Sequence, residues 1–322
     1  MKKEISYLET VKAIDEIKKY FEKQLEERLS LVKVQCPLFV RKDSGLQDAL
    51  SGKEKGVPFE TREESFEIVH SLAKWKRDAL GRYSFPLYTG LYTDMKAIRK
   101  DEMVDDIHSL LVEQWDWEKI IKKEDRTMDY LKDTVKKIYK SFWETSKFVK
   151  KKYHYISLDL PKTIFFITSQ ELEDLYPDKT PKEREEIIAK EKKAVFLIGI
   201  GDKLKSGIPH DLRSPDYDDW SLDGDMLIYD KVLNKAVELT SMGIRVDEKA
   251  LVSQLKKADC MDHIKLPYHQ KIKKKQLPYT IGGGIGESRL LLLLLEKSHI
   301  AEIQASSWEE DTLRKLKEMK VL

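Results

Sequence analysis

Cysteine is scarce in this sequence, which excludes whole classes of protein. Only Cys36 and Cys260 occur among 322 residues. Two cysteines cannot build a disulfide framework, and neither has a cysteine or histidine at the spacing of a zinc site. Free thiols are typical of a reducing compartment, so we expect a cytoplasmic protein.

Long hydrophobic runs are also missing. The longest apolar stretches, residues 194–200 and 290–295, are far shorter than the ~20 residues that a membrane-spanning helix needs. The N-terminal segment has no apolar core of a secretion signal. We therefore expect neither a membrane contact nor secretion.

An excess of one charge is absent as well. The 59 basic and 57 acidic residues leave a formal net charge of +2, which provides no overall positive field for a polyanion. We therefore expect no nucleic-acid partner. What the chain does have is enough apolar residues, 41%, for a large core at this length.

Apolar spacing predicts a mixture of helices and strands. Steps of three and four residues from Ile5 to Leu25 predict an amphipathic helix that ends near Leu29. Residues 42–57 are predicted to be a long loop. Strands are predicted at residues 31–34, 66–70, 92–99, 110–117, 163–168, 194–200, 226–229 and 236–246. Further helices are predicted at residues 72–80, 125–152 and 247–257, and two more begin after Thr168 and after Thr180, the second of which ends at Lys193. With no internal repeat and no linker, one α+β domain over residues 1–322 is the most economical interpretation.

Helix caps sharpen three of these boundaries. Ser71 is a predicted N-cap for the helix that follows it. Thr168 with Glu171, and Thr180 with Glu183, have the spacing of capping boxes.

A glycine-rich segment precedes the most apolar helix. Gly282–Gly286 is a glycine cluster directly before this helix, and Arg289 lies in the first helical turn behind it. The helix macrodipole disfavours a positive charge there, which makes Arg289 a functional candidate. Glycines also let a ligand approach the backbone, although a plain turn before a core helix fits equally well. The segment matches neither a phosphate-binding loop nor a dinucleotide fingerprint.

Seven aspartates lie between residues 211 and 230. Most are expected to be solvated loop carboxylates. Asp225 and Glu238 differ, because each borders an apolar strand, and the hydroxyl of Ser241 follows closely. Two carboxylates on neighbouring strands are typical oxygen ligands for magnesium.

Basic residues and histidines are less informative. Lys74, Lys76 and Arg77 spread over two faces of a short predicted helix, for which a solvated basic helix is the simplest interpretation. Five histidines have no catalytic or metal-binding spacing, so no role is predicted for them: His154, His210, His263, His269 and His299.

Taken together, several segments resemble one family over nearly the whole chain. They include His70-Ser-Leu-Ala-Lys-Trp-Lys-Arg77, Gln114-Trp-Asp-Trp-Glu118, Pro215-Asp-Tyr-Asp-Asp-Trp220, Ser241-Met-Gly-Ile-Arg-Val246 and Thr280-Ile-Gly-Gly-Gly-Ile-Gly286. The sequence resembles the ammonia-dependent asparagine synthetases, or aspartate–ammonia ligases. That family is similar in fold to the catalytic domain of class II aminoacyl-tRNA synthetases. The resemblance implies an antiparallel β-sheet flanked by helices, and a homodimer.

The resemblance also implies a nucleotide site for ATP. Arg99 looks like the class II arginine that binds the α-phosphate, and Arg289 looks like the one that stacks on adenine and reaches the γ-phosphate. Asp225 and Glu238 would bind Mg²⁺. The full set of implied nucleotide-binding residues is Arg99, Glu102, His108, Leu110, Glu238, Ser241, Arg245 and Arg289.

The implied reaction joins aspartate and ammonia through β-aspartyl-AMP, releasing pyrophosphate and then AMP. Asp48, Asp116 and Asp218 are candidates for the substrate ammonium and later for ammonia, with Asp218 preferred over Asp48 as the base. The candidates for binding and orienting the aspartate carboxylate are Lys76, Arg213, Gln114 and Ser71. Catalytic roles are thus predicted for Asp48, Lys76, Arg99, Asp116 and Asp218. Glutamine-dependent synthetases expose a cysteine after the initiator methionine, whereas Lys2 stands here, so free ammonia is the expected nitrogen source.

Two alternatives remain open. An aspartyl- or asparaginyl-tRNA synthetase would have an N-terminal anticodon-binding barrel of about 100 residues, whereas the class II-like core begins here within the first helix. A catalytically silent regulatory relative would lack Arg99, Glu238 or Arg289, and all three are present. One departure from the family is visible, because only Ser-Leu-Asp separates Trp220 from Gly224 where family members have a longer loop.

Overall fold

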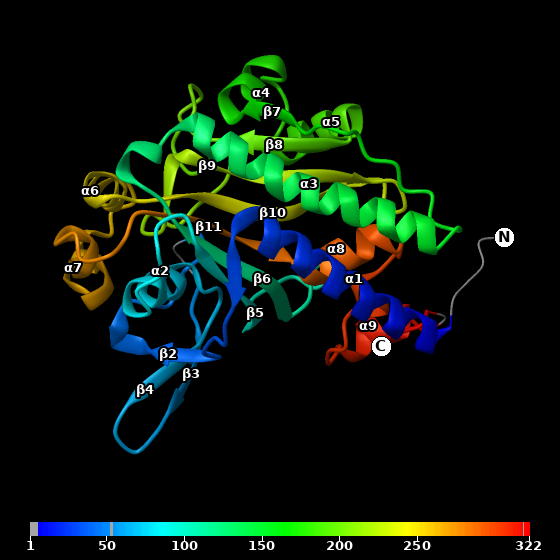
Figure 1. Ribbon diagram of the computed structural model, residues 1–322, viewed down its shortest axis with the longest axis horizontal. Helices are drawn as coiled ribbons and strands as arrows, with labels where there is room; N and C mark the ends of the chain where they lie inside the picture. Colours follow the sequence, from blue (N-terminus) through cyan, green and yellow to red (C-terminus); the bar gives the residue numbers. More distant parts are fainter. Residues whose placement is uncertain (1–5, 52–53, 318) are drawn as a thin grey trace.

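A mixed eight-stranded sheet forms the centre of the molecule, and helices pack against it (Figure 1). The structure is a computed structural model that describes residues 6–51, 54–317 and 319–322. Across the sheet the strands run in the order β1 (Leu31–Lys33), β5 (Gly90–Ile98), β6 (Leu111–Ile120), β11 (Thr280–Gly286), β10 (Lys235–Arg245), β9 (Asp218–Asp230), β8 (Ala194–Ile198) and β7 (Phe165–Thr168). The outermost pairs β1–β5 and β7–β8 are parallel, and the pairs between them are antiparallel.

The helices follow the predicted order closely. They are α1 (Tyr7–Leu29), α2 (Ala73–Arg82), α3 (Met128–Lys152), α4 (Ser169–Leu175), α5 (Pro181–Lys192), α6 (Glu248–Lys257), α7 (Pro267–Lys273), α8 (Glu287–Leu294) and α9 (Glu310–Lys315). Both predicted capping boxes, at Thr168 and Thr180, are confirmed. Among the described residues no helix is long and apolar enough to cross a membrane.

Helix α1 confirms the predicted amphipathic stripe. Ile17, Phe21 and Leu25 are completely buried, and α1 lies beside α3 across one face of the sheet (Figure 1). Ser6 and Glu9 form a capping box at its start. Ile5, where the predicted stripe begins, lies outside the described residues.

The glycine-rich segment is a strand, which overturns the alternative of a plain turn. Gly282–Gly286 forms most of β11, the strand between β6 and β10. Glycine is required there for close packing, because a Cβ on Gly282 would lie 1.9 Å from Oε2 of Glu118. Helix α8 begins directly after the strand, at Glu287, so Arg289 does lie in its first turn.

The acidic segment is also more ordered than predicted. Strand β9 begins at Asp218, and the short Ser-Leu-Asp stretch lies inside it at a bulge between the pairs Asp218–Arg245 and Asp223–Gly243. Of the seven aspartates only Asp211 is exposed. Asp225, which was set apart from the solvated group, is buried as well. The prediction of solvated carboxylates was wrong for Asp216, Asp218, Asp219, Asp223 and Asp230.

A second, three-stranded sheet lies beside α2 and was only partly predicted. Its order is β2 (Phe39–Arg41), β4 (Ser65–Ile68) and β3 (Val57–Glu60). Only β4 had a recognisable alternating pattern. The predicted loop after residue 42 is confirmed up to β3 for the described residues; residues 52 and 53 lie outside them.

Candidate active site

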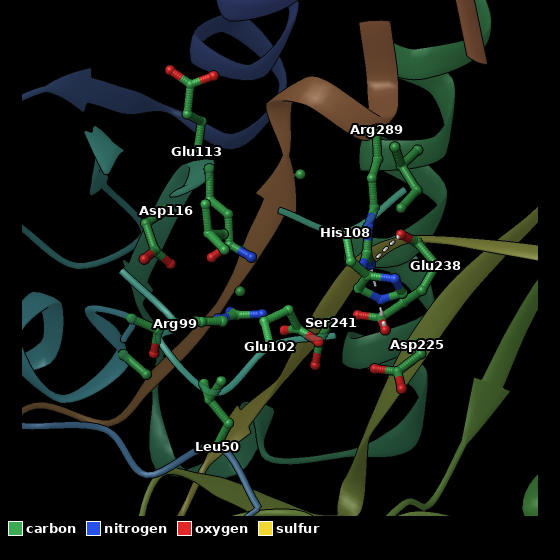
Figure 2. Close-up of a pocket in the computed structure, with 18 of the residues that line it drawn as sticks. Leu50, Arg99, Glu102, His108, Glu113, Asp116, Asp225, Glu238, Ser241 and Arg289 are labelled. Atoms are coloured by element: carbon green, nitrogen blue, oxygen red, sulfur yellow. Dashed lines mark hydrogen bonds and ion pairs between the residues drawn. The ribbon is translucent and has the colours of Figure 1, made fainter. Parts of the chain in front are cut away.

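A polar pocket lies over the central strands and brings most of the predicted site residues together (Figure 2). Fourteen of them line it: Ser71, Lys76, Arg99, Glu102, His108, Gln114, Asp116, Arg213, Asp218, Asp225, Glu238, Ser241, Arg245 and Arg289. Asp48 and Leu110 are not part of the lining.

Asp48 lies behind the pocket wall, where it caps α2. Its Oδ2 accepts hydrogen bonds from Oγ of Ser71 at 2.5 Å and from the backbone N–H of Ala73 at 2.7 Å. The prediction that Ser71 caps this helix is therefore wrong, because its hydroxyl is bonded to Asp48 and makes no cap. Burial raises the pKa of Asp48 to about 6, against the attraction of Lys74. Asp48 thus orients Ser71 instead of facing the pocket itself.

Helix α2 presents buried basic residues, not the predicted solvated face. Nζ of Lys76 is bonded to Asp116 and, at 3.0 Å, to the carbonyl of Gly283. Arg77 donates to the carbonyls of Val246 at 2.7 Å and Pro278 at 2.9 Å. Buried charges need such partners, so these contacts hold α2 firmly against β6 and β11.

Asp216 and two histidines complete this buried network. Lys74 donates to Oδ2 of Asp216 at 3.0 Å, and Nε2 of His269 lies 2.8 Å from the same oxygen. Asp216, His263 and His269 have ligand atoms within 4.8 Å of one another. The ammonium of Lys74 already occupies the carboxylate, which favours a structural ion network over a cation site.

Arg245 lies at the bottom of the pocket between two carboxylates. Its Nε is 3.0 Å from Oε1 of Glu118, its Nη2 is 2.7 Å from Oε2, and its Nη1 is bonded to Asp218. Burial raises the pKa of Asp218, against the attraction of Arg245. Sequence reasoning missed Glu118, although the two-residue period of β6 places it on the same face as Gln114 and Asp116.

Asp225 is bound by an arginine. Nη2 of Arg213 lies 2.7 and 2.8 Å from the two carboxylate oxygens of Asp225, and Nη1 is bonded to Oγ of Ser241. Burial raises the pKa of Asp225 to about 7, against Arg213 and with the repulsion of Glu238. The side chain of Glu238 is 41% exposed and offers its carboxylate to the pocket, whereas both oxygens of Asp225 are bound to Arg213. This donor set suits a hard cation such as Mg²⁺.

Arg99 and Arg289 bring two positive charges into the same pocket. Nη1 of Arg289 lies 3.8 Å from Oε2 of Glu238 and donates to its carbonyl at 3.0 Å, and Figure 2 shows the side chain directed toward Glu238 and His108. Nε of Arg99 is buried and has no hydrogen-bond partner among the described residues. Burial lowers the pKa of Arg99, and the charge of Arg289 lowers it further. The pocket is thus prepared for an anion.

The backbone around Arg99 explains the position of two other predicted residues. The carbonyl of Leu110 accepts from the N–H of Arg99 at 2.9 Å, and the carbonyl of Arg99 accepts from Glu102 at 3.1 Å. Leu110 therefore contributes to the site by holding Arg99, while its side chain stays outside the lining.

Among the lining residues that were not predicted, four polar ones form a hydrogen-bonded group. Oγ of Ser109 donates to Gln304 at 2.5 Å, and Nε2 of Gln304 lies 3.2 Å from Oγ of Ser288 and 3.4 Å from Glu113. Ser288 neighbours Arg289 in the sequence and could have been found from it. Gln304 has no local signal, because only the tertiary structure brings the C-terminal segment to the pocket.

Comparison with known proteins identifies the family. The family model described as aspartate-ammonia ligase matches residues 8–320. The chain belongs to this family. Proteins named aspartate–ammonia ligase from Clostridium tetani and Clostridium perfringens are 55% and 56% identical to it, over 97% and 98% of this chain and 93% and 94% of their own length. One from Fusobacterium nucleatum is 53% identical over 98% of this chain and 97% of its own.

Solved structures agree with the fold that the family implies. The asparaginyl-tRNA synthetase of Entamoeba histolytica, in complex with asparaginyl-adenylate, superimposes with a TM-score of 0.63 at 14% identity, covering 92% of this chain and 66% of that one. The enzyme of Pyrococcus horikoshii gives a TM-score of 0.66 at 14% identity, covering 91% of this chain and 67% of that one. The predicted class II synthetase-like fold of this aspartate–ammonia ligase family member is confirmed.

Proposed function

We propose that this protein makes asparagine from aspartate and ammonia at the expense of ATP, with AMP and pyrophosphate as products. One observation supports this most directly. Two guanidinium groups, of Arg99 and Arg289, face a pocket that also contains the paired carboxylates Asp225 and Glu238 and the buried ion pair of Lys76 and Asp116. Such a pocket suits a nucleoside triphosphate beside a small amino acid.

In the first step the β-carboxylate of aspartate attacks the α-phosphorus of ATP and pyrophosphate leaves. A carboxylate has no leaving group for ammonia to displace, and adenylation supplies one. Arg99 would hold the α-phosphate, and Arg289 the adenine and γ-phosphate. Planar, permanently charged guanidinium groups suit this task because they bind phosphate with two hydrogen bonds. His108, Glu102 and Ser241 would complete the nucleotide site.

A magnesium ion held by Asp225 and Glu238 would neutralise the charge of the triphosphate. Arg245 is expected to act differently from the other arginines. Because Glu118 and Asp218 already share its charge, it would act beside the nucleotide by orienting Asp218.

Aspartate itself would be held at both of its α-substituents. Lys76, Gln114 and Ser71 are proposed for its α-carboxylate, with Arg213 at the rim. Asp116 and Asp218 are proposed for its α-ammonium. Holding these groups leaves the β-carboxylate free and fixes its distance to the phosphate, which is the main source of rate in such a step.

In the second step ammonia attacks the acyl carbon of β-aspartyl-AMP and AMP leaves. Most ammonia is protonated at neutral pH, so a carboxylate must accept a proton first. Asp218 lines the pocket while Asp48 lies behind it, which favours Asp218 as that base. Burial raises the pKa of Asp218, which makes it a stronger base than an ordinary aspartate.

Three further features belong to this proposal. We treat residues 1–322 as one catalytic domain, because its pocket-lining residues extend from Leu50 to Gln304. The two cysteines are free thiols, which agrees with a cytoplasmic location. A second copy of the chain is the proposed partner, and no nucleic acid is.

The reaction is tested by incubating the protein with ATP, magnesium, aspartate and ammonium while AMP and asparagine are measured. Equal amounts of both products are expected. ADP as the product would contradict adenylation, and no turnover would favour the silent regulatory alternative. A tRNA charging assay with aspartate or asparagine tests the synthetase alternative, and no aminoacylation is expected.

A further inference from the structure

Asp223 is a fully buried aspartate beside the pocket, and it has no role in the proposed reaction. Its Oδ1 accepts from the N–H of Ile200 at 2.8 Å. Its Oδ2 has no hydrogen-bond partner among the described residues, and neither has Nε of Arg213, which lies 3.8 Å from that oxygen. Buried polar groups are almost always hydrogen-bonded, so two unpaired polar atoms at this separation require an explanation.

The present position of Arg213 conflicts with a cation site on Asp225. Arg213 covers both carboxylate oxygens of Asp225 and also binds the hydroxyl of Ser241. A divalent cation at Asp225 would lie within a few ångströms of the guanidinium, where repulsion between like charges is strong inside a protein. Arg213 must therefore leave Asp225 before a cation binds there.

We propose that Asp223 is a positioning residue that receives Arg213 when a divalent cation binds Asp225 and Glu238. This inference rests on the magnesium site of the proposed function. The movement is short, because Nε needs to approach Oδ2 by about 1 Å to reach hydrogen-bond distance. It pairs both unsatisfied atoms at once, and rotation of the guanidinium about the new contact draws Nη1 and Nη2 away from Ser241 and Asp225.

The surrounding backbone suits this exchange. Arg213 lies in the segment between β8 and β9 that has no regular structure, so its side chain is not tied to a strand. Asp223 is held firmly, since the N–H of Gly199 donates to its carbonyl at 3.0 Å. Gly243 leaves space for it, because a Cβ there would lie 2.8 Å from Cβ of Asp223.

The test is a titration with Mn²⁺ in the absence of nucleotide, followed by electron paramagnetic resonance of the free ion. Asp223→Asn keeps the acceptor for Ile200 but removes the charge, so we expect Mn²⁺ to bind about tenfold more weakly. Arg213→Met removes the competing cation and is expected to bind Mn²⁺ more tightly than the unmodified protein. The variant with both substitutions should bind Mn²⁺ as tightly as Arg213→Met does, because without Arg213 there is no guanidinium for Asp223 to bind. Asp202→Asn, which removes an exposed carboxylate from the same segment, is the control and should bind normally.

The outcomes separate this inference from the proposed function. If the unmodified protein binds no Mn²⁺ with or without ATP, the magnesium site itself is wrong. If it binds Mn²⁺ but Asp223→Asn binds equally well, or if Asp223→Asn weakens binding to the same extent in the Arg213→Met background, the inference is overturned and the site remains. Should Asp223→Asn fail to fold, Arg213→Met decides alone, and unchanged or weaker Mn²⁺ binding by that variant overturns the inference.

Discussion

Individual arginines in this pocket differ in how far neighbouring groups neutralise them. Arg245 and Arg213 are each bound to carboxylates, whereas Arg99 has an unpaired Nε and Arg289 lies 3.8 Å from its nearest carboxylate oxygen. An incompletely paired guanidinium has the most to gain from a phosphate. At the residue scale, Arg99 and Arg289 are therefore the strongest determinants of nucleotide binding.

Replacing Arg289 with alanine tests this directly. A charged hydrogen bond contributes about 1.5–3 kcal/mol, so we expect the KM for ATP to rise by about 10- to 100-fold, while the KM for aspartate changes little. Isotope exchange between ATP and pyrophosphate measures both. Arg314→Ala, an exposed arginine on α9, should leave both values unchanged, and an unaltered KM for ATP in Arg289→Ala would contradict the assigned role.

The stability of the protein should depend on pH through Asp48. Burial raises its pKa from 3.8 to about 6, so between these values the folded state holds a proton that the unfolded state has released. The stabilisation is complete below about pH 4 and is lost as the pH rises through 6, about 3 kcal/mol in total, of which roughly half is lost above pH 5. Urea unfolding at pH 5 and pH 7 measures this difference. In Asp48→Asn the free energy of unfolding should fall less between pH 5 and pH 7. An equal fall in that variant would refute the assignment of this pH dependence to Asp48.

At the scale of elements, β11 shows why a glycine strand lies in the middle of the sheet. The side chains of β6 extend over it, so that Gln114 and Glu118 occupy the space above Gly284 and Gly282. The glycines therefore leave room for the polar groups of the pocket, which any larger residue would displace.

Gly282→Ala should destabilise the protein and abolish most activity. The new Cβ would lie 1.9 Å from Glu118 and 2.7 Å from Nη2 of Arg245, and disrupting a buried ion pair costs about 3–5 kcal/mol. Gly81→Ala in α2 is the matched control, because its Cβ would meet Pro278 only at 3.5 Å. Thermal unfolding should show a lower midpoint for the first variant alone; equal midpoints would show that the strand tolerates a side chain.

At the scale of the whole molecule, β1 forms an open edge of the large sheet. It pairs only with β5 among the described strands, and Val32 on it is 57% exposed. An unpaired apolar edge invites association with a second chain, which agrees with the proposed homodimer.

A charge at this edge should separate the subunits. We expect light scattering after size-exclusion chromatography to give twice the chain mass for the unmodified protein and the single-chain mass for Val32→Glu. Val232→Glu introduces the same charge at a 38% exposed valine in the turn between β9 and β10, and it should remain dimeric. A single-chain mass for the unmodified protein would exclude the dimer.

The sequence alone determined most of the helices and strands and fourteen of the pocket residues, whereas α7 and α9 were not predicted. It could do so because apolar periodicity and caps are local signals, and because the family resemblance covers nearly the whole chain. Tertiary structure decided the burial of the aspartates, the cap that Asp48 gives to α2, and the strand at Gly282–Gly286. Each of these depends on a partner distant in the chain, such as Lys74 with Asp216 or Glu118 with Arg245. No local sequence pattern shows whether a charged side chain will form an ion pair with a residue distant in the chain. Formation of that ion pair decides whether the side chain is solvated or buried.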